Sequence, residues 1–311
     1  MTRIEEHIEE HLRRLRSLRY SPRTIRQATF GLRNLAAWLA SQGVTSPDAL
    51  RARHLDNWLE ALSSRMTGVG RPLKARSVNK QVEIAKGLLR HMASTGVVSS
   101  SLAARLQYVK EPSTLPGSVL THAQVRRMLD AVVTDSAEGV RNRTMLELMY
   151  SSGVRVAELL GLDVDSFDLA NRTAVVTGKG DKQRMVPFGR EAARLLEAYL
   201  KAIRPHLVSD AAEKALFLDG SGKRLPYHTF RRIVHAVAEA AGLDVNVTPH
   251  TFRRSCTTEL LRSGANMYHV KELLGHESLD TLKHYAKLTI TDLKATHARC
   301  HPRERDGKER L

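Results

Sequence analysis

The stretch 172–188, "RTAVVTGKGDKQRMVPF", decides the fold class because it interrupts a chain whose other segments follow a helical period. Val175–Val176 and Met185–Val186 flank the turn sequence Gly-Lys-Gly-Asp, which is typical of a β-hairpin. Helical patterns precede the stretch and resume from about residue 190. We therefore predict a mainly α fold with a small antiparallel β-sheet.

The N-terminal third of the chain follows a helical period throughout. Residues 4–18 carry apolar side chains at helical spacing, and a second helix begins with Ser21 as N-cap and Pro22 at its first position. Further helices are predicted around residues 47–62 and in "ARSVNKQVEIAKGLLRHMASTG" at 75–96. This pattern predicts an all-helical N-terminal block.

A change in composition at residues 111–121 separates this block from the rest of the chain. The segment "EPSTLPGSVLT" combines two prolines and a glycine with Ser and Thr residues, which is typical of an interdomain linker. We therefore predict a helical domain at 1–111, a linker at 112–120, and a mostly helical second domain with the small sheet at 121–311.

The net charge indicates a polyanionic partner. The chain has 49 Lys and Arg residues against 33 Asp and Glu residues, a formal net charge of +16 and a pI of about 10.2. The excess is densest in residues 1–112, with 19 Lys and Arg against 9 Asp and Glu. Neutralising phosphates releases condensed counterions, so this balance favours nucleic acid over the alternative of a merely soluble basic protein.

The densest basic run lies on and before the predicted helix at 75–96. Between Arg65 and Arg90 there are seven Lys or Arg residues and a single acid, Glu83. A charge run is often only a solvated face, but inside a basic domain a phosphate-contacting surface is the better interpretation. The predicted DNA-binding residues are Arg76, Lys80, Lys86 and Arg90.

Composition also disfavours several classes of protein. There is no run of about 18 apolar residues, and the charged start "MTRIEEHIEEHL" lacks the apolar core of a signal peptide. With only Cys256 and Cys300, neither a disulfide framework nor a cysteine-rich zinc site is expected. We therefore expect a cytoplasmic, nucleoid-associated protein without a membrane partner.

Four segments of the second domain place polar groups where packing alone does not require them. In "SSGVRVAELLGL", Arg155 stands at a helix start, which the helix dipole disfavours unless the arginine and the helix jointly address an anion. In "TGKGDKQRMVPF", Lys179 is left unshielded between two glycines at the hairpin tip. Each of these residues alone could be an ordinary surface side chain.

The other two segments add histidine, arginine and tyrosine. In "VTPHTFRRSCTTELLRSG", His250 and Arg253 are three residues apart at a helix start, so they can reach one phosphate from two directions. In "LLGHESLDTLKHYAKL", His276 lies in a turn and Tyr285 lies beside the packing stripe of the following helix. The plainer alternatives are a satisfied surface pair and an amphipathic helix with one aromatic residue.

The combined set is cationic and gives no indication of a metal site. Despite 14 histidines, no HExxH or CxxC motif occurs, and the nearby acids do not cluster at ligand spacing. Positive donors can stabilise the charge of a pentavalent phosphorus transition state without a metal or another cofactor. A tyrosine hydroxyl, with a pKa of about 10 in water, becomes a useful nucleophile only when a base and cations activate it.

Six residues together resemble the tyrosine recombinase, or phage integrase, family, and most closely its Xer-like members: Arg155, Lys179, His250, Arg253, His276 and Tyr285. The motifs "SSGVRVAELLGL", "GKGDKQRMVPF", "TPHTFRRSCTTELL" and "LLGHESLDTLKHYA" follow the order of that family. The stretches "YSPRTIRQATFGLRNLAAWLASQG" and "ARSVNKQVEIAKGLLRHM" look like its core-binding domain. The resemblance implies a two-domain, C-shaped clamp, with a helical core-binding domain and a tyrosine recombinase catalytic domain.

The resemblance also implies a role for each of the six residues. Tyr285 would attack the scissile phosphate and leave a 3′-phosphotyrosyl bond and a free 5′-hydroxyl. Lys179 would protonate the leaving 5′-oxygen, and His250 would assist as a base. The non-bridging oxygens would be held by Arg155, Arg253 and His276.

The function implied by the resemblance is site-specific recombination in a tetrameric synapse, without metal, ATP or cofactor, to integrate, excise or resolve a DNA element. The partners would be duplex DNA with a specific target site and further copies of a chain that is a monomer or dimer when free; the need for accessory proteins is left open. Glu158 is expected to be structural, and Arg254, where many relatives carry His, bears on target preference. A type IB topoisomerase and a catalytically inactive DNA-binding regulator are the alternatives.

Overall fold

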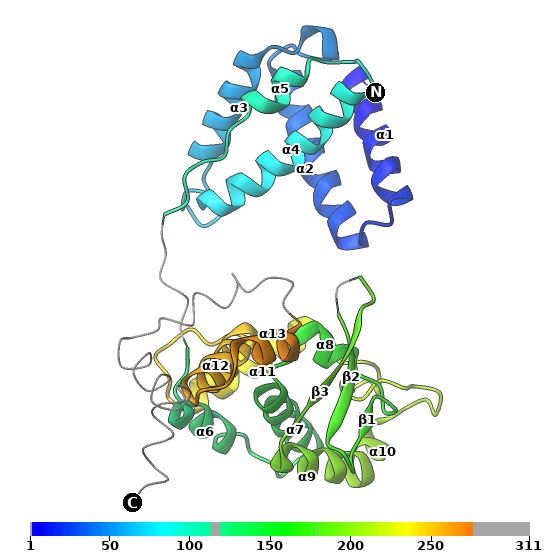
Figure 1. The fold of residues 1–311 in the computed structure, drawn as a ribbon, viewed down its shortest axis with the longest axis vertical. Coiled ribbons are helices and arrows are strands. Elements are labelled where there is room, and N and C mark those ends of the chain that lie inside the picture. The colour runs from blue at the N-terminus through cyan, green and yellow to red at the C-terminus, as the bar shows by residue number, and fades with distance from the viewer. Residues whose placement is uncertain (1, 113–118, 179, 276–311) are drawn as a thin grey trace, which may run out of the picture. The chain divides into compact units, whose positions relative to one another are not determined.

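The structure is a computed structural model that describes residues 2–112, 119–178 and 180–275 (Figure 1). The chain forms two compact units, Met1–Thr114 and Leu115–Leu311. Most of the predicted linker at 112–120 lies outside the described residues, as do three predicted site residues: Lys179, His276 and Tyr285.

The first unit is built of helices, as its periodicity predicts. Its elements are α1 (Arg3–Ser17), α2 (Pro22–Ser41), the 3₁₀ turn η1 (Pro47–Ala49), α3 (Ala52–Ser64), α4 (Ala75–Ser94) and α5 (Ser100–Arg105). Ser21 caps α2 as predicted, because its hydroxyl accepts a hydrogen bond from the backbone N–H of Thr24 at 3.2 Å. The helix predicted around 47–62 is wrong at its start, since Leu50 and Arg51 are extended and separate η1 from α3.

Helices α1, α2 and α4 pack together around the core of this unit. Leu12, Leu32 and Val82, one from each helix, are fully buried, and burying such a side chain stabilises the fold by about 1.5–3 kcal/mol. The same core holds two histidines, His11 of α1 and His91 of α4, whose ring centroids are 5.3 Å apart. The solvent-facing side of α4 is left to polar side chains.

The second unit combines helices with one three-stranded sheet. Its helices are α6 (His122–Asp130), α7 (Ala137–Ser152), α8 (Val156–Gly161), α9 (Arg190–Ala198), the π-helical turn η2 (Tyr199–Ile203), α10 (Arg204–Leu207), α11 (Tyr227–Ala240), α12 (Pro249–Arg262) and α13 (Met267–Leu274). Its strands are β1 (Phe167–Asp168), β2 (Thr173–Thr177) and β3 (Gln183–Pro187), in the order β1-β2-β3. Together the two units confirm the predicted mainly α class with a small antiparallel sheet.

The hairpin of β2 and β3 confirms the prediction made from residues 172–188. The two strands are antiparallel, with Val175 opposite Met185 and Val176 opposite Arg184. Val175 and Met185 are exposed, whereas the Val176–Arg184 pair lies on the inner face of the sheet. The short strand β1, which the sequence pattern does not predict, pairs antiparallel with the other edge of β2.

Helix α7 lies in the centre of the second unit, where it packs against α6, α8, α9 and α12 (Figure 1). Its side chains Met145, Leu146 and Met149 are completely buried in the core. The C-terminal end of α7 leads directly into α8, so a rigid central helix positions the residues at this junction. In the described part of the chain, no helix combines the length and the apolar character that crossing a membrane would need.

Candidate active site

The turn between α7 and α8 places Arg155 at the centre of the second unit. Helix α7 ends at Gly153 in the left-handed conformation, with φ of 63°, and Arg155 is the extended N-cap residue of α8. A Cβ atom at Gly153 would lie 2.9 Å from Cδ2 of Leu274 and 3.2 Å from Sγ of Cys256. Glycine is therefore required both by the backbone conformation and by the close approach of α12 and α13.

The second arginine, Arg253, is buried on α12. Thr248 and Pro249 begin this helix as predicted, and the Arg253 side chain points from its first turns into the interior. Its guanidinium donates to the carbonyl oxygen of Gly153 at 2.6 Å and to that of Leu274 at 2.5 Å. Burial, followed by repulsion from Arg155, lowers the pKa of Arg253 to about 10, so the side chain remains charged at neutral pH.

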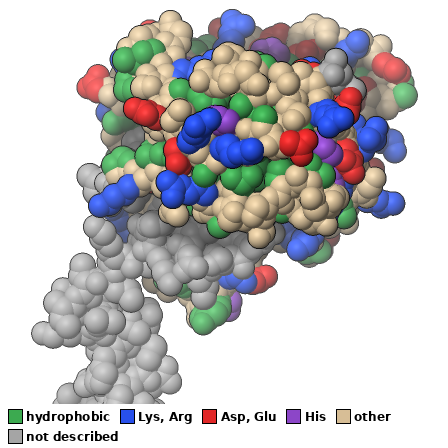
Figure 2. Space-filling view, turned by 90° about the horizontal axis from the view of Figure 1, so that it is seen from above, with side chains coloured by type: hydrophobic (Ala, Val, Ile, Leu, Met, Phe, Trp, Pro, Cys, Tyr) green, Lys and Arg blue, Asp and Glu red, His purple; other side chains and the backbone are tan. Residues whose placement is uncertain are grey.

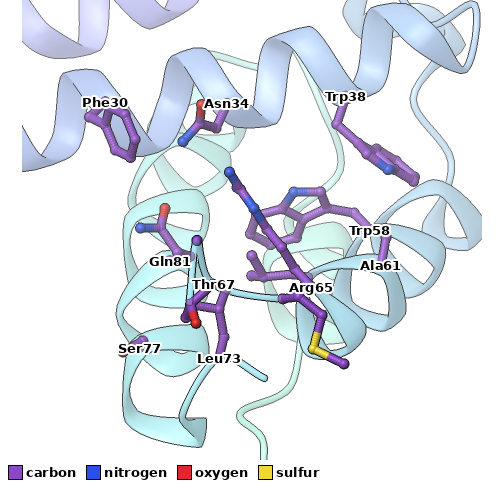
Figure 3. A pocket seen from close by; sticks show the side chains of 13 residues that line it. Phe30, Asn34, Trp38, Trp58, Ala61, Arg65, Thr67, Leu73, Ser77 and Gln81 are labelled. Carbon is purple, nitrogen blue, oxygen red and sulfur yellow. The ribbon is translucent and has the colours of Figure 1, made fainter. Parts of the chain in front are cut away.

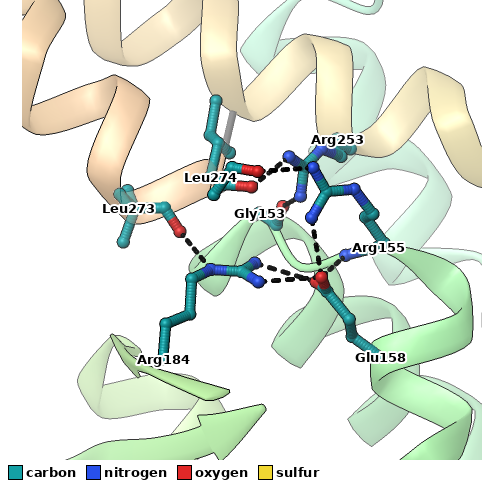
Figure 4. A network of polar contacts seen from close by, with 8 residues as sticks. Gly153, Arg155, Glu158, Arg184, Arg253, Leu273 and Leu274 are labelled. Carbon is teal, nitrogen blue, oxygen red and sulfur yellow. Dashed lines mark hydrogen bonds and ion pairs between the residues drawn. The ribbon is translucent and has the colours of Figure 1, made fainter. Parts of the chain in front are cut away.

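Arg155 and Arg253 converge on the last turn of α13 (Figure 4). Nη1 of Arg155 donates to Oε1 of Glu158 at 2.7 Å, and Nη2 donates to the carbonyl oxygen of Gly275 at 2.7 Å. The side chain of Arg155 is 36% exposed, so part of its guanidinium remains open to a ligand. Two guanidinium groups from distant parts of the unit's sequence thus converge on the end of α13, which is an arrangement suited to binding a phosphate.

His250 belongs to the same group of residues. It is the exposed second residue of α12, and it lies close enough to Arg253, Arg254 and Arg155 to feel their charge. Desolvation, followed by these three cations, lowers the pKa of His250 below its ordinary value of 6.5. The imidazole is therefore neutral at pH 7 and can accept a proton.

The other three predicted catalytic residues, Lys179, His276 and Tyr285, lie outside the described residues, but two of their chain neighbours reach the site. Gly178, in the hairpin turn and directly before Lys179 in the chain, lies beside Glu158: a Cβ atom added to Gly178 would be 3.3 Å from Oε1 of Glu158. Gly275, the last described residue and the neighbour of His276 in the chain, accepts a hydrogen bond from Arg155 on its carbonyl oxygen. The structure therefore brings together Arg155, His250 and Arg253, and the described neighbours Gly178 and Gly275 lie at the same site.

Sequence reasoning missed Arg184, the third arginine of the site. Its guanidinium forms a two-pronged ion pair with Glu158, with Nη1–Oε1 and Nη2–Oε2 distances of 2.8 Å (Figure 4). Burial alone would raise the pKa of Glu158, but hydrogen bonds from Arg184 and Arg155 outweigh it and lower that pKa to about 2. One signal could have revealed Arg184: a charged residue at an inward-facing position of the predicted strand, two places before Val186.

Within the described residues, no group of three His, Cys, Asp or Glu side chains is arranged to hold a metal ion. The acid at the centre of the site, Glu158, already accepts hydrogen bonds on both oxygens from Arg155 and Arg184. The positive charge near a bound anion would come from arginines.

The four predicted DNA-binding residues on α4 differ in their surroundings. Arg76, Lys80 and Arg90 are exposed. They lie on one side of the helix, because Lys80 and Arg90 follow Arg76 by four and by fourteen residues. Nζ of Lys86 instead lies 4.6 Å from the ring centroid of Tyr108, and Arg90 lies 3.6 Å from the carboxylate of Glu83. Arg76 and Lys80 have no acidic partner in the described residues, so they are the two that are free to contact a phosphate.

A pocket of about 500 Å³ opens beside this helix in the first unit (Figure 3). Phe30 and Trp38 of α2 and Trp58 of α3 supply its aromatic lining, and the amides of Asn34 and Gln81 also line it. On one face of the molecule, Lys and Arg side chains stand among acidic and apolar ones (Figure 2). The net charge alone therefore does not mark the surface that contacts nucleic acid.

A second basic surface, which sequence reasoning missed, lies on α11. Seven residues of this helix, four of which are His or Arg, line a hollow of about 550 Å³: Tyr227, His228, Arg231, Arg232, His235, Ala236 and Glu239. The opposite side of the helix is buried through Phe230 and Val234, so the basic face is the one left to solvent. The amphipathic pattern of "YHTFRRIVHAVAEA", with histidine and arginine on its polar face, is the signal that could have found it.

The profile of the phage integrase family matches residues 118–291, which is more than half of the chain. The chain belongs to the phage integrase family. The resemblance stated from the six residues is thereby confirmed at the level of the family. This phage integrase family member is 39% identical to the tyrosine recombinase XerC of Mycobacterium tuberculosis over 283 residues, which are 89% of this chain and 92% of that protein.

Solved structures show the same two-domain fold. The Tn1549 transposon integrase in complex with a circular intermediate DNA has a TM-score of 0.74 at 18% identity, covering 96% of this chain and 99% of that one. The XerH site-specific recombinase bound to its difH substrate has a TM-score of 0.68 at 20% identity, covering 88% and 79%. At these identities the likeness establishes the fold of this phage integrase family member.

Proposed function

We propose that this phage integrase family member is a site-specific DNA recombinase that cuts and rejoins duplex DNA through a 3′-phosphotyrosyl intermediate. One observation carries the proposal: Arg155 and Arg253 meet, with a neutral His250 beside them, at the turn that precedes His276. The identity to mycobacterial tyrosine recombinases over nearly the whole chain supports the same class of enzyme.

In the proposed reaction, the two arginines bind the scissile phosphate before any bond changes. Arg155 and Arg253 donate to the non-bridging oxygens, together with His276. These oxygens gain charge in the pentavalent transition state, so fixed cations stabilise the transition state more than the bound substrate. Removing one such charged donor costs roughly 3–4 kcal/mol of transition-state stabilisation.

Tyr285 is the proposed nucleophile. Its oxygen forms a bond to phosphorus while the bond from phosphorus to the 5′-oxygen breaks, which leaves the DNA 3′-phosphate on the tyrosine. The phenolic proton passes to neutral His250, and Lys179 gives a proton to the departing 5′-oxygen. Attack by the 5′-hydroxyl of another strand reverses these steps, so neither a metal ion nor ATP is needed.

The proposed DNA-contact surfaces lie on both units. On the first unit, assigned as the core-binding domain at 1–111, Arg76 and Lys80 face solvent on α4. On the second unit, assigned as the catalytic domain at 121–311, the exposed face of α11 carries Tyr227, His228 and Arg231. The proposed target is a specific site on duplex DNA that both units contact. Strand exchange would take place in a tetramer on that DNA, in the cytoplasm on the nucleoid.

The test is covalent capture of DNA. The full-length chain is incubated with duplex fragments of the source genome that carry a nick near the cleaved position, so that the released strand diffuses away and rejoining fails. Wild type should form a protein–DNA adduct that survives denaturation and is insensitive to a chelator. Tyr285→Phe should bind DNA and form no adduct, whereas Tyr268→Phe, which changes an exposed tyrosine of α13, should behave as wild type.

Three results would contradict the proposal. An adduct that persists in Tyr285→Phe would exclude this tyrosine as nucleophile. Specific DNA binding by wild type with no adduct on any fragment would favour the inactive regulator, and adduct formation with supercoil relaxation but no joining of two duplexes would favour the type IB topoisomerase.

A further inference from the structure

Arg184 occupies an inward-facing position in a strand, where a charge is costly unless it is paired. It lies on β3 opposite Val176 and two residues before the buried Val186, and its side chain is only 17% exposed. A buried ion must regain in specific contacts what it loses in hydration. The contacts of Arg184 therefore indicate what the residue does.

The first contact is a fork onto Glu158. Nη1 and Nη2 of Arg184 each donate to one carboxylate oxygen at 2.8 Å, and Arg155 donates to the same two oxygens from its backbone N–H and from Nη1, both at 2.7 Å. The Glu158 side chain is only 2% exposed and is held from four directions. Arg184 therefore fixes the position of the Glu158 carboxylate. Because Nη1 of Arg155 donates to this carboxylate, Arg184 also fixes that edge of the Arg155 guanidinium.

The second contact is with the end of α13. Nε of Arg184 donates to the carbonyl oxygen of Leu273 at 3.1 Å. The flat face of the guanidinium lies against Gly275, where an added Cβ atom would meet its Cζ, Nε and Nη1 atoms at 3.0 Å. Gly275 has a φ of 61° and precedes His276 in the chain, so only glycine permits both the turn and this stacking.

Three successive carbonyl oxygens at the end of α13 are thereby held by three different arginines. Leu273 accepts from Arg184, Leu274 from Arg253, and Gly275 from Arg155. The partial negative charge of a helix C-terminus favours such cations. Arg184 differs from the other two arginines because all three of its guanidinium nitrogens donate hydrogen bonds to protein oxygens. Its function is therefore to hold other protein groups in place.

We propose that Arg184 is a positioning residue for strand cleavage, which orients the Arg155 guanidinium through Glu158 and holds the last turn of α13 against the same group. The role rests on the proposed recombinase function. It requires an arginine, because a lysine offers a point charge and cannot reproduce the planar fork and the Nε bond.

The experiment measures the single-turnover rate of adduct formation on the nicked duplex that wild type cleaves. Arg184→Lys should slow the rate about 100-fold, as misplacement of a phosphate-binding group by about 1 Å does, while the affinity for duplex DNA stays near wild type. The matched control is Arg194→Lys, because Arg194 forms a similar fork with Glu191 on the exposed surface of α9. That variant should cleave as wild type does.

A second variant and a second substrate separate positioning from loss of structure. Glu158→Gln weakens the same ion pair from its other side and should show the same selective loss, and the double variant should be no slower than the slower single one. On a duplex whose scissile phosphate carries a methyl group in place of one non-bridging oxygen, the charge that Arg155 neutralises is gone. The deficit of Arg184→Lys should then largely disappear.

The outcomes are distinguishable. If wild type forms no adduct, the proposed function is wrong and the role of Arg184 falls with it. If wild type cleaves and Arg184→Lys cleaves equally fast, only the role of Arg184 is overturned. Losses that multiply in the double variant, or a deficit that persists on the uncharged phosphonate, would also overturn it.

Discussion

Nη2 of Arg155 donates to the carbonyl oxygen of Gly275 at 2.7 Å and so joins the start of α8 to the end of α13. This bond connects residues 120 positions apart in the chain, and Arg253 makes the neighbouring bond to Leu274. The phosphate-binding arginines and the turn before His276 are therefore parts of one hydrogen-bonded group. Substitutions at the α7–α8 junction should therefore alter the position of the end of α13.

Gly153→Ala tests this connection. The added methyl group would sit at a φ of 63° and 2.9 Å from Leu274, so it should lower the free energy of unfolding by about 1–3 kcal/mol and slow adduct formation. Gly161→Ala is the matched control, because Gly161 ends α8 with no atom within 4 Å of a new Cβ. Urea unfolding of both variants is the measurement, and equal stabilities would contradict the prediction.

The acid limb of the cleavage rate should report His250. Its pKa is lowered below 6.5 by desolvation and by Arg253, Arg254 and Arg155, so the imidazole is neutral above pH 6.5 and gains a proton only at lower pH. A base must be neutral to accept the phenolic proton, and the single-turnover rate should therefore fall as the pH is lowered, with a midpoint below the ordinary histidine value of 6.5. His250→Gln should cleave more slowly at pH 7.5 and lose the acid limb; an unchanged limb would assign the titration elsewhere.

Stability of the first unit should fall with acid because of His11. Burial, followed by the charges of His91 and Arg14, lowers the pKa of His11 to about 4. In the unfolded chain His11 takes up a proton near pH 6.5, whereas in the folded unit it does so only near pH 4. The free energy of unfolding is therefore highest above pH 6.5 and decreases as the pH falls from 6.5 towards 4. Linkage makes the loss roughly 3 kcal/mol.

Urea unfolding at pH 7.5, 6.0 and 5.0 checks this dependence. Another titratable group near the His11 and His91 rings is Glu10, whose carboxylate lies 3.9 Å from Nε2 of His91. His11→Gln removes the titrating ring and should flatten the dependence. A variant that loses stability with acid as steeply as wild type would show that other groups control it.

The two open residues of α4 should matter more for DNA binding than the two that have partners. Arg76→Gln and Lys80→Gln should each weaken binding similarly on all sequences and reduce the slope of log K against log salt by about 1. Lys86→Gln and Arg90→Gln should have smaller effects, because these side chains are engaged by Tyr108 and Glu83. Filter binding at several salt concentrations measures the slopes, and four equal slopes would contradict the distinction.

Local patterns in the sequence were sufficient for most of the fold. The alternation of Val175–Val176 with Met185–Val186 around a glycine turn predicts the hairpin, and Ser21 with Pro22 predicts the start of α2. These features depend on neighbouring residues only. The start of α3 was missed because apolar spacing continues through Leu50, although its backbone is extended.

The candidate site depends on contacts between distant residues, which local patterns do not contain. Arg155 and Arg253 could be selected for their unusual places at helix starts, but their meeting with α13 follows from tertiary packing. Arg184 reads as an ordinary polar residue of a hairpin until Glu158 is seen beside it. Lys86 likewise reads as a phosphate contact until Tyr108, from beyond α5, is seen under its ammonium group.

The most direct test of the account is the identity of the residue that carries the DNA. Adduct formed by wild type on the nicked duplex is digested with protease and nuclease, and the nucleotide-linked peptide is sequenced by mass spectrometry. We predict a nucleotide joined to Tyr285 through its 3′-phosphate, and a large fall in the yield of this adduct for Arg155→Ala and Arg253→Ala. A nucleotide on any other residue, or full yield without both arginines, would contradict it.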